Sequence, residues 1–143
     1  MFCRILVPLD GSATAEAVLP FVRDEARCHS ATVVLIRVIA PLRDSLMMVP
    51  SLVEQATEKS IEIMTNYLED VASSLRTEGL DVEIVLKHGQ PAQTIIDFAE
   101  ESGCDLIIIG TRGETGALQW RFGGVASKVI RARTTMPVLV VTT

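Results

Sequence analysis

The sequence has little of what a disulfide-stapled, membrane-spanning or nucleic-acid-binding protein needs. Its three cysteines are odd in number and form no Cys-x-x-Cys pair, so we interpret them as small buried hydrophobes in a reducing cytoplasm. No apolar run approaches the roughly 20 residues of a membrane span, and Arg4 interrupts the apolar start, so no signal peptide is expected. The formal net charge of -5 repels DNA, RNA and anionic membranes. Any bound anion must be held by a local arrangement of donors.

Groups that would indicate catalysis are also scarce. The two histidines, His29 and His88, have no companion ligands at metal-binding spacing and no partners for a catalytic triad. Ser12 is not inside a G-x-S-x-G elbow, so it is better explained as a helix cap than as a nucleophile. Without a general base or an activated nucleophile, fast catalysis is not expected.

Short β-branched runs alternate with helical patterns along the whole chain. The 143 residues suit one domain over 1–143. The patterns predict strands at 3–9, 31–39, 82–86, 106–109 and 137–141, and helices over 13–28, 51–78, 91–102 and 124–132. This alternation indicates an open, mainly parallel α/β sheet with helices on both faces. Ligands of such sheets bind where the strand order reverses, so the loops that begin at Asp10 and Gly110 are the places to look.

Local signals refine several of these elements. Ser12 is a suitable N-cap for the first helix, and Pro20 predicts a kink in it. Val18, Phe21, Val22 and Ala26 are expected to form its apolar face. The segment 51–54 matches a capping box for the longest helix, Gly79 suits the end of that helix, and Pro91 suits the first turn of the next.

The most informative segment is the glycine-rich stretch over 110–124, GTRGETGALQWRFGG. It follows a buried strand and leads into a helix, and it is longer than most connections in α/β proteins. Its glycines let the backbone approach a ligand, consecutive amides there can form an anion nest, and the helix beginning near Gly124 adds a positive dipole end. These features predict a phosphate site. The alternative is a plain loop whose glycines only turn the chain.

Two common phosphate motifs do not fit this segment. It has no Gly-Lys-Ser/Thr, so it is not a P-loop. A dinucleotide fingerprint belongs after the first strand, where this chain has Asp10, Gly11 and Ser12 instead.

The chain resembles the universal stress protein family. The glycines at 110, 113 and 123 match that family's ATP-binding pattern G-x2-G-x9-G. Further matches are ILVPLDGS at 5–12, Val38-Ile39, GQP at 89–91 and PVLVV at 137–141. The resemblance implies a Rossmann-like fold of five mainly parallel strands and a cytoplasmic, stress-linked regulatory protein that binds ATP or another adenine nucleotide, with Mg²⁺.

The resemblance also implies positions for the nucleotide. Asp10, after Pro8, is expected near the ribose and phosphates, and the backbone of Val38 at the adenine edge. Gly110 and Gly113 are expected to line the approach to the ribose, and the backbone at Gly123, Gly124 and Val125 to hold the outer phosphates. A homodimer through the last strand, Pro137 to Val141, is also implied, and this pairing would protect a hydrophobic edge.

One position departs from the family pattern. Gly124 stands where a Ser or Thr is usual, so one hydroxyl donor is missing, which predicts an affinity lower by roughly tenfold to a hundredfold. Thr111, Arg112 or Ser127 are candidate substitutes. The departure keeps a second hypothesis open, a protein-interaction scaffold without nucleotide. A third is an enzyme, either a flavodoxin-like redox protein or a hydrolase, for which the sequence lacks a catalytic set; slow ATP hydrolysis stays compatible with the sequence.

Overall fold

The computed structural model describes residues 1–40, 50–111, 124–132 and 134–142. The elements are β1 (Arg4–Pro8), α1 (Ala13–Glu16), α2 (Leu19–His29), β2 (Thr32–Ile39), α3 (Pro50–Thr77), β3 (Asp81–His88), α4 (Pro91–Glu101), β4 (Leu106–Thr111), α5 (Gly124–Arg131) and β5 (Val138–Thr142). The predicted loop over 40–50 falls largely outside the described residues.

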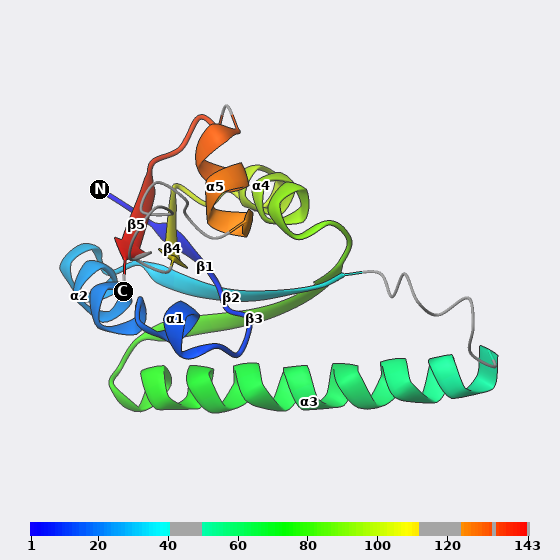
Figure 1. Cartoon of the computed structure of the whole chain (residues 1–143). Coiled ribbons are helices and arrows are strands. Elements are labelled where there is room, and N and C mark those ends of the chain that lie inside the picture. The colour runs from blue at the N-terminus through cyan, green and yellow to red at the C-terminus, as the bar shows by residue number, and fades with distance from the viewer. Residues whose placement is uncertain (41–49, 112–123, 133, 143) are drawn as a thin grey trace.

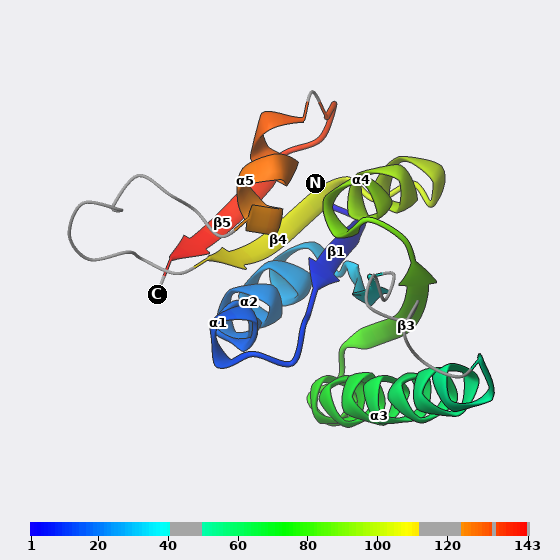
Figure 2. The ribbon, with the colours of Figure 1, turned by 45° about the vertical axis from the view of Figure 1, so that its right-hand side comes forward.

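The strands form one parallel sheet in the order β3-β2-β1-β4-β5. Helices α1, α2 and α3 lie on one face of the sheet, and α4 and α5 lie side by side on the other (Figures 1 and 2). The predicted Rossmann-like architecture, with five strands, is therefore confirmed. The chain order of the strands reverses between β1 and β4, and this position creates a crevice at their carboxyl ends.

Both faces of the sheet carry a hydrophobic core. In β4, Leu106 and Ile108 pack into the core under α1, α2 and α3, whereas Ile107 and Ile109 pack into the core under α4 and α5. The strand was expected to be buried on both faces because it lacks polar alternation, and it is. The prediction of buried cysteines holds only for Cys104, because Cys3 and Cys28 are exposed thiols.

The predicted kink in the first helix is a complete break. Ser12 caps α1, with its Oγ accepting a bond from the N–H of Ala15 at 3.1 Å, as predicted. Helix α1 ends at Glu16, and α2 begins at Leu19, where Pro20 occupies the first turn and needs no intrahelical hydrogen bond. The predicted apolar face is wrong for Phe21, which is 48% exposed, whereas Val18, Val22 and Ala26 are buried as predicted.

Helix α3 is longer than the part of it that packs on the sheet. It begins at Pro50, within one residue of the predicted start near Ser51, and the predicted capping bond of the Ser51 side chain lies outside what the structure describes. Its buried residues run from Leu68 to Leu75, and Gly79, at φ +89°, follows its C-terminal end as expected. The N-terminal half extends past the sheet (Figure 1), with Ile63 60% exposed. No helix within the described ranges is both long enough and apolar enough to cross a membrane.

Gly110 lies inside β4 rather than in the loop that was predicted to begin there, because β4 continues to Thr111. A Cβ at Gly110 would lie 2.5 Å from the Thr14 carbonyl oxygen and 3.2 Å from Cγ1 of Val18. The position needs glycine because α1 crosses β4 at this close distance.

We therefore predict that Gly110→Ala is destabilising. The added methyl group meets backbone, which cannot rotate away, so we expect a loss of about 1–3 kcal/mol in the free energy of unfolding, measured by urea denaturation. Gly124→Ala is the matched control, since a Cβ there would meet no atom of the described residues within 4 Å, and it should be neutral or slightly stabilising. Equal stability of the two variants would contradict this reading of Gly110.

Candidate binding pocket

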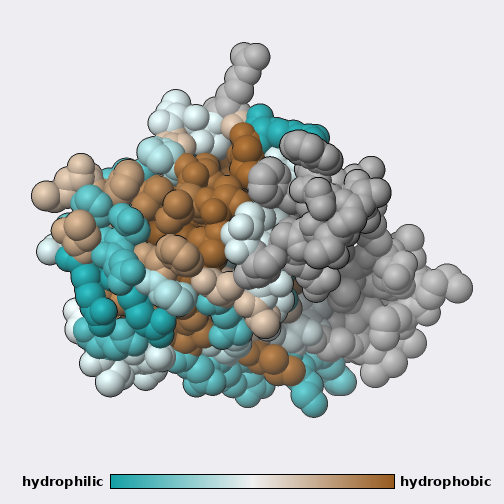
Figure 3. All heavy atoms as spheres, turned by 60° about the vertical axis from the view of Figure 1, so that its left-hand side comes forward, coloured by the Kyte–Doolittle hydropathy of each residue, from teal (hydrophilic) through white to brown (hydrophobic). Residues whose placement is uncertain are grey.

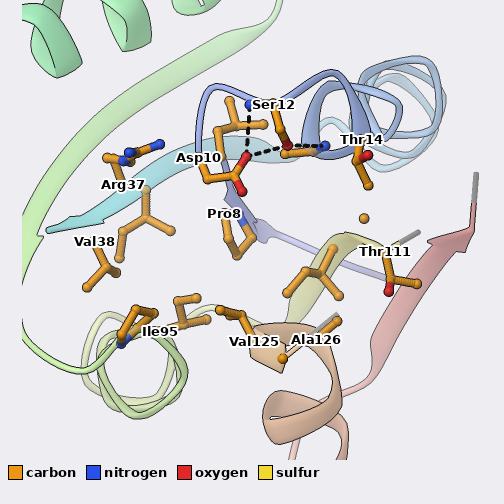
Figure 4. Close-up of a pocket in the computed structure, with 17 residues that line it drawn as sticks. Pro8, Asp10, Ser12, Thr14, Arg37, Val38, Ile95, Thr111, Val125 and Ala126 are labelled. Atoms are coloured by element: carbon orange, nitrogen blue, oxygen red, sulfur yellow. Dashed lines mark hydrogen bonds between the residues drawn. The ribbon is translucent and has the colours of Figure 1, made fainter. Parts of the chain in front are cut away.

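A cavity of about 420 Å³ opens at the carboxyl ends of β1, β2 and β4. The loop after β1 forms one wall, and the first turns of α4 and α5 form the opposite wall (Figure 4). The cavity lies where the strand order reverses, which is the expected position for a ligand of an open α/β sheet.

Most of the residues predicted for a site meet at this cavity. The predicted residues that line it are Pro8, Asp10, Val38, Gly110, Thr111, Gly124 and Val125. The other three, Arg112, Gly113 and Gly123, lie outside the described residues. The structure thus brings together segments that are separated by more than a hundred positions in the sequence.

Sequence reasoning missed several lining residues. Arg37 is the clearest, because it is the one charged residue in the otherwise apolar strand β2; that contrast was a usable signal. Pro91 and Ile95, at the start of α4, also line the pocket. They were interpreted only as helix start and apolar face, since a helical pattern does not indicate which residues reach the end of a sheet.

The carboxylate of Asp10 is fixed by its neighbour two residues on. Oδ1 accepts hydrogen bonds from the backbone N–H of Ser12 at 2.9 Å and from its hydroxyl at 2.5 Å. Burial raises the pKa of Asp10, but these bonds and the positive charge of Arg37 outweigh it, so the pKa lies below its ordinary value. No described residue bonds to Oδ2, and Figure 4 shows the carboxylate beside the cavity. The pocket therefore presents an ionised acceptor to hydroxyl or amine donors.

Apolar side chains form the part of the cavity around Val38 and α4. Val38 from β2, Ile95 from α4 and Val125 from α5 point into it from three directions (Figure 4). Ile95 is buried in the core, whereas Val38 is half-buried and Val125 is 37% exposed. A flat, apolar ring is the kind of ligand group that such a slot accepts.

The first turn of α5 forms the end of the cavity next to β4. Gly124 and Val125 are the first residues of this helix, and both line the pocket. The first N–H groups of a helix lack intrahelical acceptors and carry the positive end of the dipole, so this end favours anions. A Cβ at Gly124 would meet no atom of the described residues within 4 Å, so none of them requires a glycine at this position.

A protein-only metal site is not present in the part of the chain that the structure describes. No group of three or more His, Cys, Asp or Glu side chains comes together there. Asp10 is the one carboxylate among the described lining residues. A magnesium ion here would need a ligand's own oxygens to complete its coordination, as Mg²⁺ usually does with phosphates.

The sheet order and the cavity at its reversal define an open, Rossmann-like α/β protein, and comparison with known proteins gives its family. The model of the universal stress protein family matches residues 1–142. The chain is 31% identical to Universal stress protein MJ0577 of Methanocaldococcus jannaschii, over 99% of this chain and 95% of that protein. It is 32% identical to a universal stress protein of Thermus aquaticus, over 99% of each. The chain belongs to the universal stress protein family.

Solved structures agree with this assignment. The structure of MJ0577 superposes with a TM-score of 0.84, covering 100% of this chain and 97% of that one. More distant members share the fold, with ligands in two cases. A universal stress protein in complex with cAMP has a TM-score of 0.69 at 17% identity, covering 98% of this chain and 96% of that one. An Arabidopsis thaliana member with AMP bound has a TM-score of 0.73 at 14% identity, covering 98% and 91%.

The role of Ser12 generates a prediction about pH. Ser12→Ala removes the hydroxyl bond to Asp10 and the cap on Ala15, so the pKa of Asp10 should rise and the fold should lose about 0.5–2 kcal/mol. The pKa of Asp10 is lowered in the folded protein. The ionised Asp10 carboxylate therefore stabilises the fold at pH values above the ordinary carboxyl pKa, and this stabilisation is lost as the pH falls through the lowered pKa. NMR titration of the Asp10 carboxyl carbon measures its pKa in each variant. Ser12→Thr, which keeps a hydroxyl, should retain the lowered pKa of the wild type. An unchanged pKa in the alanine variant would refute the assignment.

Proposed function

We propose that this protein binds an adenine nucleotide, ATP with Mg²⁺ by preference, in the cavity at the carboxyl ends of β1, β2 and β4. The observation that carries the proposal is that one cavity brings together three chemistries: apolar side chains, a fixed carboxylate and a helix N-terminus. Adenine, ribose and phosphates have matching chemistries. In this proposal the protein is a cytoplasmic regulatory module of the stress response.

The base and the ribose have separate complements. The apolar surface formed by Val38 and Ile95 suits adenine, and the backbone of Val38 is available at its edge. Asp10 suits the ribose, because its ionised carboxylate accepts hydrogen bonds from hydroxyl groups and Ser12 restricts its rotation.

The phosphates would lie toward α5. The start of this helix supplies backbone donors without requiring a basic surface, which fits a protein of net charge -5. The glycine pattern that ends at Gly123 and Gly124, with Gly113 and Arg112 before it, is the proposed continuation of this site. Magnesium, when bound, would neutralise phosphate charge, with Asp10 as the described carboxylate nearest the ligand.

Two further observations support the nucleotide. The relatives solved with AMP and with cAMP carry adenine nucleotides on the same fold. Gly124 lacks the family's usual hydroxyl, but a glycine keeps its backbone N–H, and Gly124 lines the cavity. We therefore expect binding that is weaker than the full motif would give, rather than none.

Isothermal titration calorimetry with ATP and Mg²⁺ tests the proposal, and Val125→Glu locates the site. A carboxylate placed in the first turn of α5 should repel phosphate and lower affinity at least tenfold. Ile130→Glu is a matched control on the same helix, since Val125 is 37% and Ile130 40% exposed and Ile130 does not line the cavity. It should bind like the wild type. No heat with the wild type at millimolar ATP would favour the scaffold hypothesis, and equal losses in both variants would contradict this location.

We also propose a homodimer through β5. This strand is an edge of the described sheet, and its Val138, Leu139 and Val140 are only half-buried. The side of the molecule on which β5 lies carries a broad apolar surface (Figure 3). Pairing with a second copy would cover both the apolar surface and the free backbone groups of the edge.

Val140→Pro should abolish this dimer. The carbonyl of Pro137 accepts from Ile107 at 3.1 Å, so by the alternation of a parallel ladder the backbone N–H of Val140 points to the free edge. Proline there removes an edge donor while sparing the ladder with β4. Sedimentation velocity should give two chains per particle for the wild type and one for the variant; a monomeric wild type would refute the proposal.

A further inference from the structure

Thr14 is a hydroxyl-bearing residue of the cavity wall that no sequence pattern singled out. It lies in α1 and lines the cavity together with Gly110 and Thr111, the last two residues of β4. The carbonyl oxygen of Thr14 would be 2.5 Å from a Cβ on Gly110, so the close crossing of α1 holds Thr14 against the end of β4. Figure 4 shows Thr14 on the same side of the cavity as Thr111, with Val38 and Ile95 on the other side. Thr14 therefore belongs to the end of the cavity proposed for the phosphates.

The hydroxyl of Thr14 has no hydrogen-bond partner among the described residues, whereas the hydroxyl of Ser12 is fully used. Ser12 Oγ donates its one proton to Oδ1 of Asp10 at 2.5 Å and accepts from the N–H of Ala15 at 3.1 Å. A threonine inside a helix can bond the carbonyl four residues earlier. Thr14 lies in the first turn of α1, so that carbonyl, of Asp10, precedes the helix. The Thr14 hydroxyl therefore keeps its proton for a ligand.

Packing fixes the position of Thr14 in the protein without a ligand. Ala15, the next residue, is buried in the core between α1 and the sheet, and Ser12 caps the helix two residues before Thr14. Thr14 is itself half-buried, and its β-branched side chain has few rotamers. Because the donor is already placed, a ligand that accepts from it loses little conformational entropy of the protein on binding.

The opposite wall has no side-chain donor at the corresponding position. Gly124 is the first residue of α5 and lines the cavity without a side chain. Of the substitutes considered from the sequence, Ser127 does not line the cavity, and Thr111 lines it but is only 2% exposed. The third, Arg112, lies outside the described residues. Thr14 is thus the described hydroxyl that best reaches a ligand at this end.

We propose that Thr14 is a ligand-binding residue whose hydroxyl donates a hydrogen bond to the phosphate chain from the wall opposite α5. The inference deepens the proposed function and rests on it for the identity of the ligand. The backbone N–H groups at the start of α5 hold the phosphates from one wall, and Thr14 holds them from the other. The donor that position 124 lacks is thus supplied by α1. The bond is charge-assisted, because its acceptor is an ionised phosphate oxygen.

Calorimetric titration of Thr14→Val with ATP and Mg²⁺ tests the inference, since valine is close to threonine in shape but has no hydroxyl. The affinity should fall by roughly tenfold relative to the wild type. Thr14→Ser, which keeps the hydroxyl, should bind ATP like the wild type. Thr65→Val is the matched control, because Thr65 is a half-buried threonine of α3 that does not line the cavity. It should also bind like the wild type, and a loss equal to that of Thr14→Val would contradict a local role of Thr14.

Gly124→Ser provides the complementary test, because it places a hydroxyl on the opposite wall. In this background Thr14→Val should lose less affinity than it does in the wild type, since two donors to the same phosphates are not additive. A loss of equal size in both backgrounds would overturn the replacement of one hydroxyl by the other. Equal affinities of the wild type and Thr14→Val would overturn this inference and leave the proposed function standing. No heat with the wild type at millimolar ATP would overturn both.

Discussion

The close crossing of α1 over β4 is the constraint on which the pocket depends. A strand that carried any side chain at position 110 would meet the Thr14 carbonyl and hold α1 away from the sheet. Because Gly110 has none, α1 lies low, and the loop over Asp10, Gly11 and Ser12 reaches across the position where the strand order reverses. The wall of the cavity is therefore a consequence of helix–strand packing. Gly110 belongs to the glycine pattern of a nucleotide site, but the close packing of α1 on β4 already requires a glycine at this position.

Ser12 connects this packing to chemistry. Its hydroxyl accepts from the backbone of Ala15 and donates to the carboxylate of Asp10, so one side chain begins the helix and orients the acceptor. Both bonds use local geometry, and their cost in conformational entropy is small because Asp10 and Ala15 are close in sequence. A preorganised acceptor of this kind lowers the entropic cost of binding, which matters most where another contact, the hydroxyl absent at Gly124, is missing.

Local patterns predicted what depends on local interactions. The burial of β4, the cap at Ser12 and the helix end at Gly79 follow from a few adjacent residues, and seven predicted site residues meet at one cavity. The exposure of Phe21 was predicted wrongly, because helical spacing alone does not decide which residues meet the sheet. Arg37 was missed although it is the one charged residue of β2, because a strand pattern does not show which of its residues reach the cavity.

An acidic protein that binds a polyanion must separate its charges along the site. Here the ionised Asp10 and the anion-favouring start of α5 line the same cavity from opposite walls. A ligand whose anionic part approached Asp10 would be repelled, whereas the reverse orientation is favourable at both walls. Arg37 reduces the field of Asp10 without removing the acceptor, so the carboxylate can accept hydroxyl donors beside a phosphate chain. In the proposed complex, the electrostatics of the two walls would favour one orientation of the nucleotide, with its phosphates toward α5.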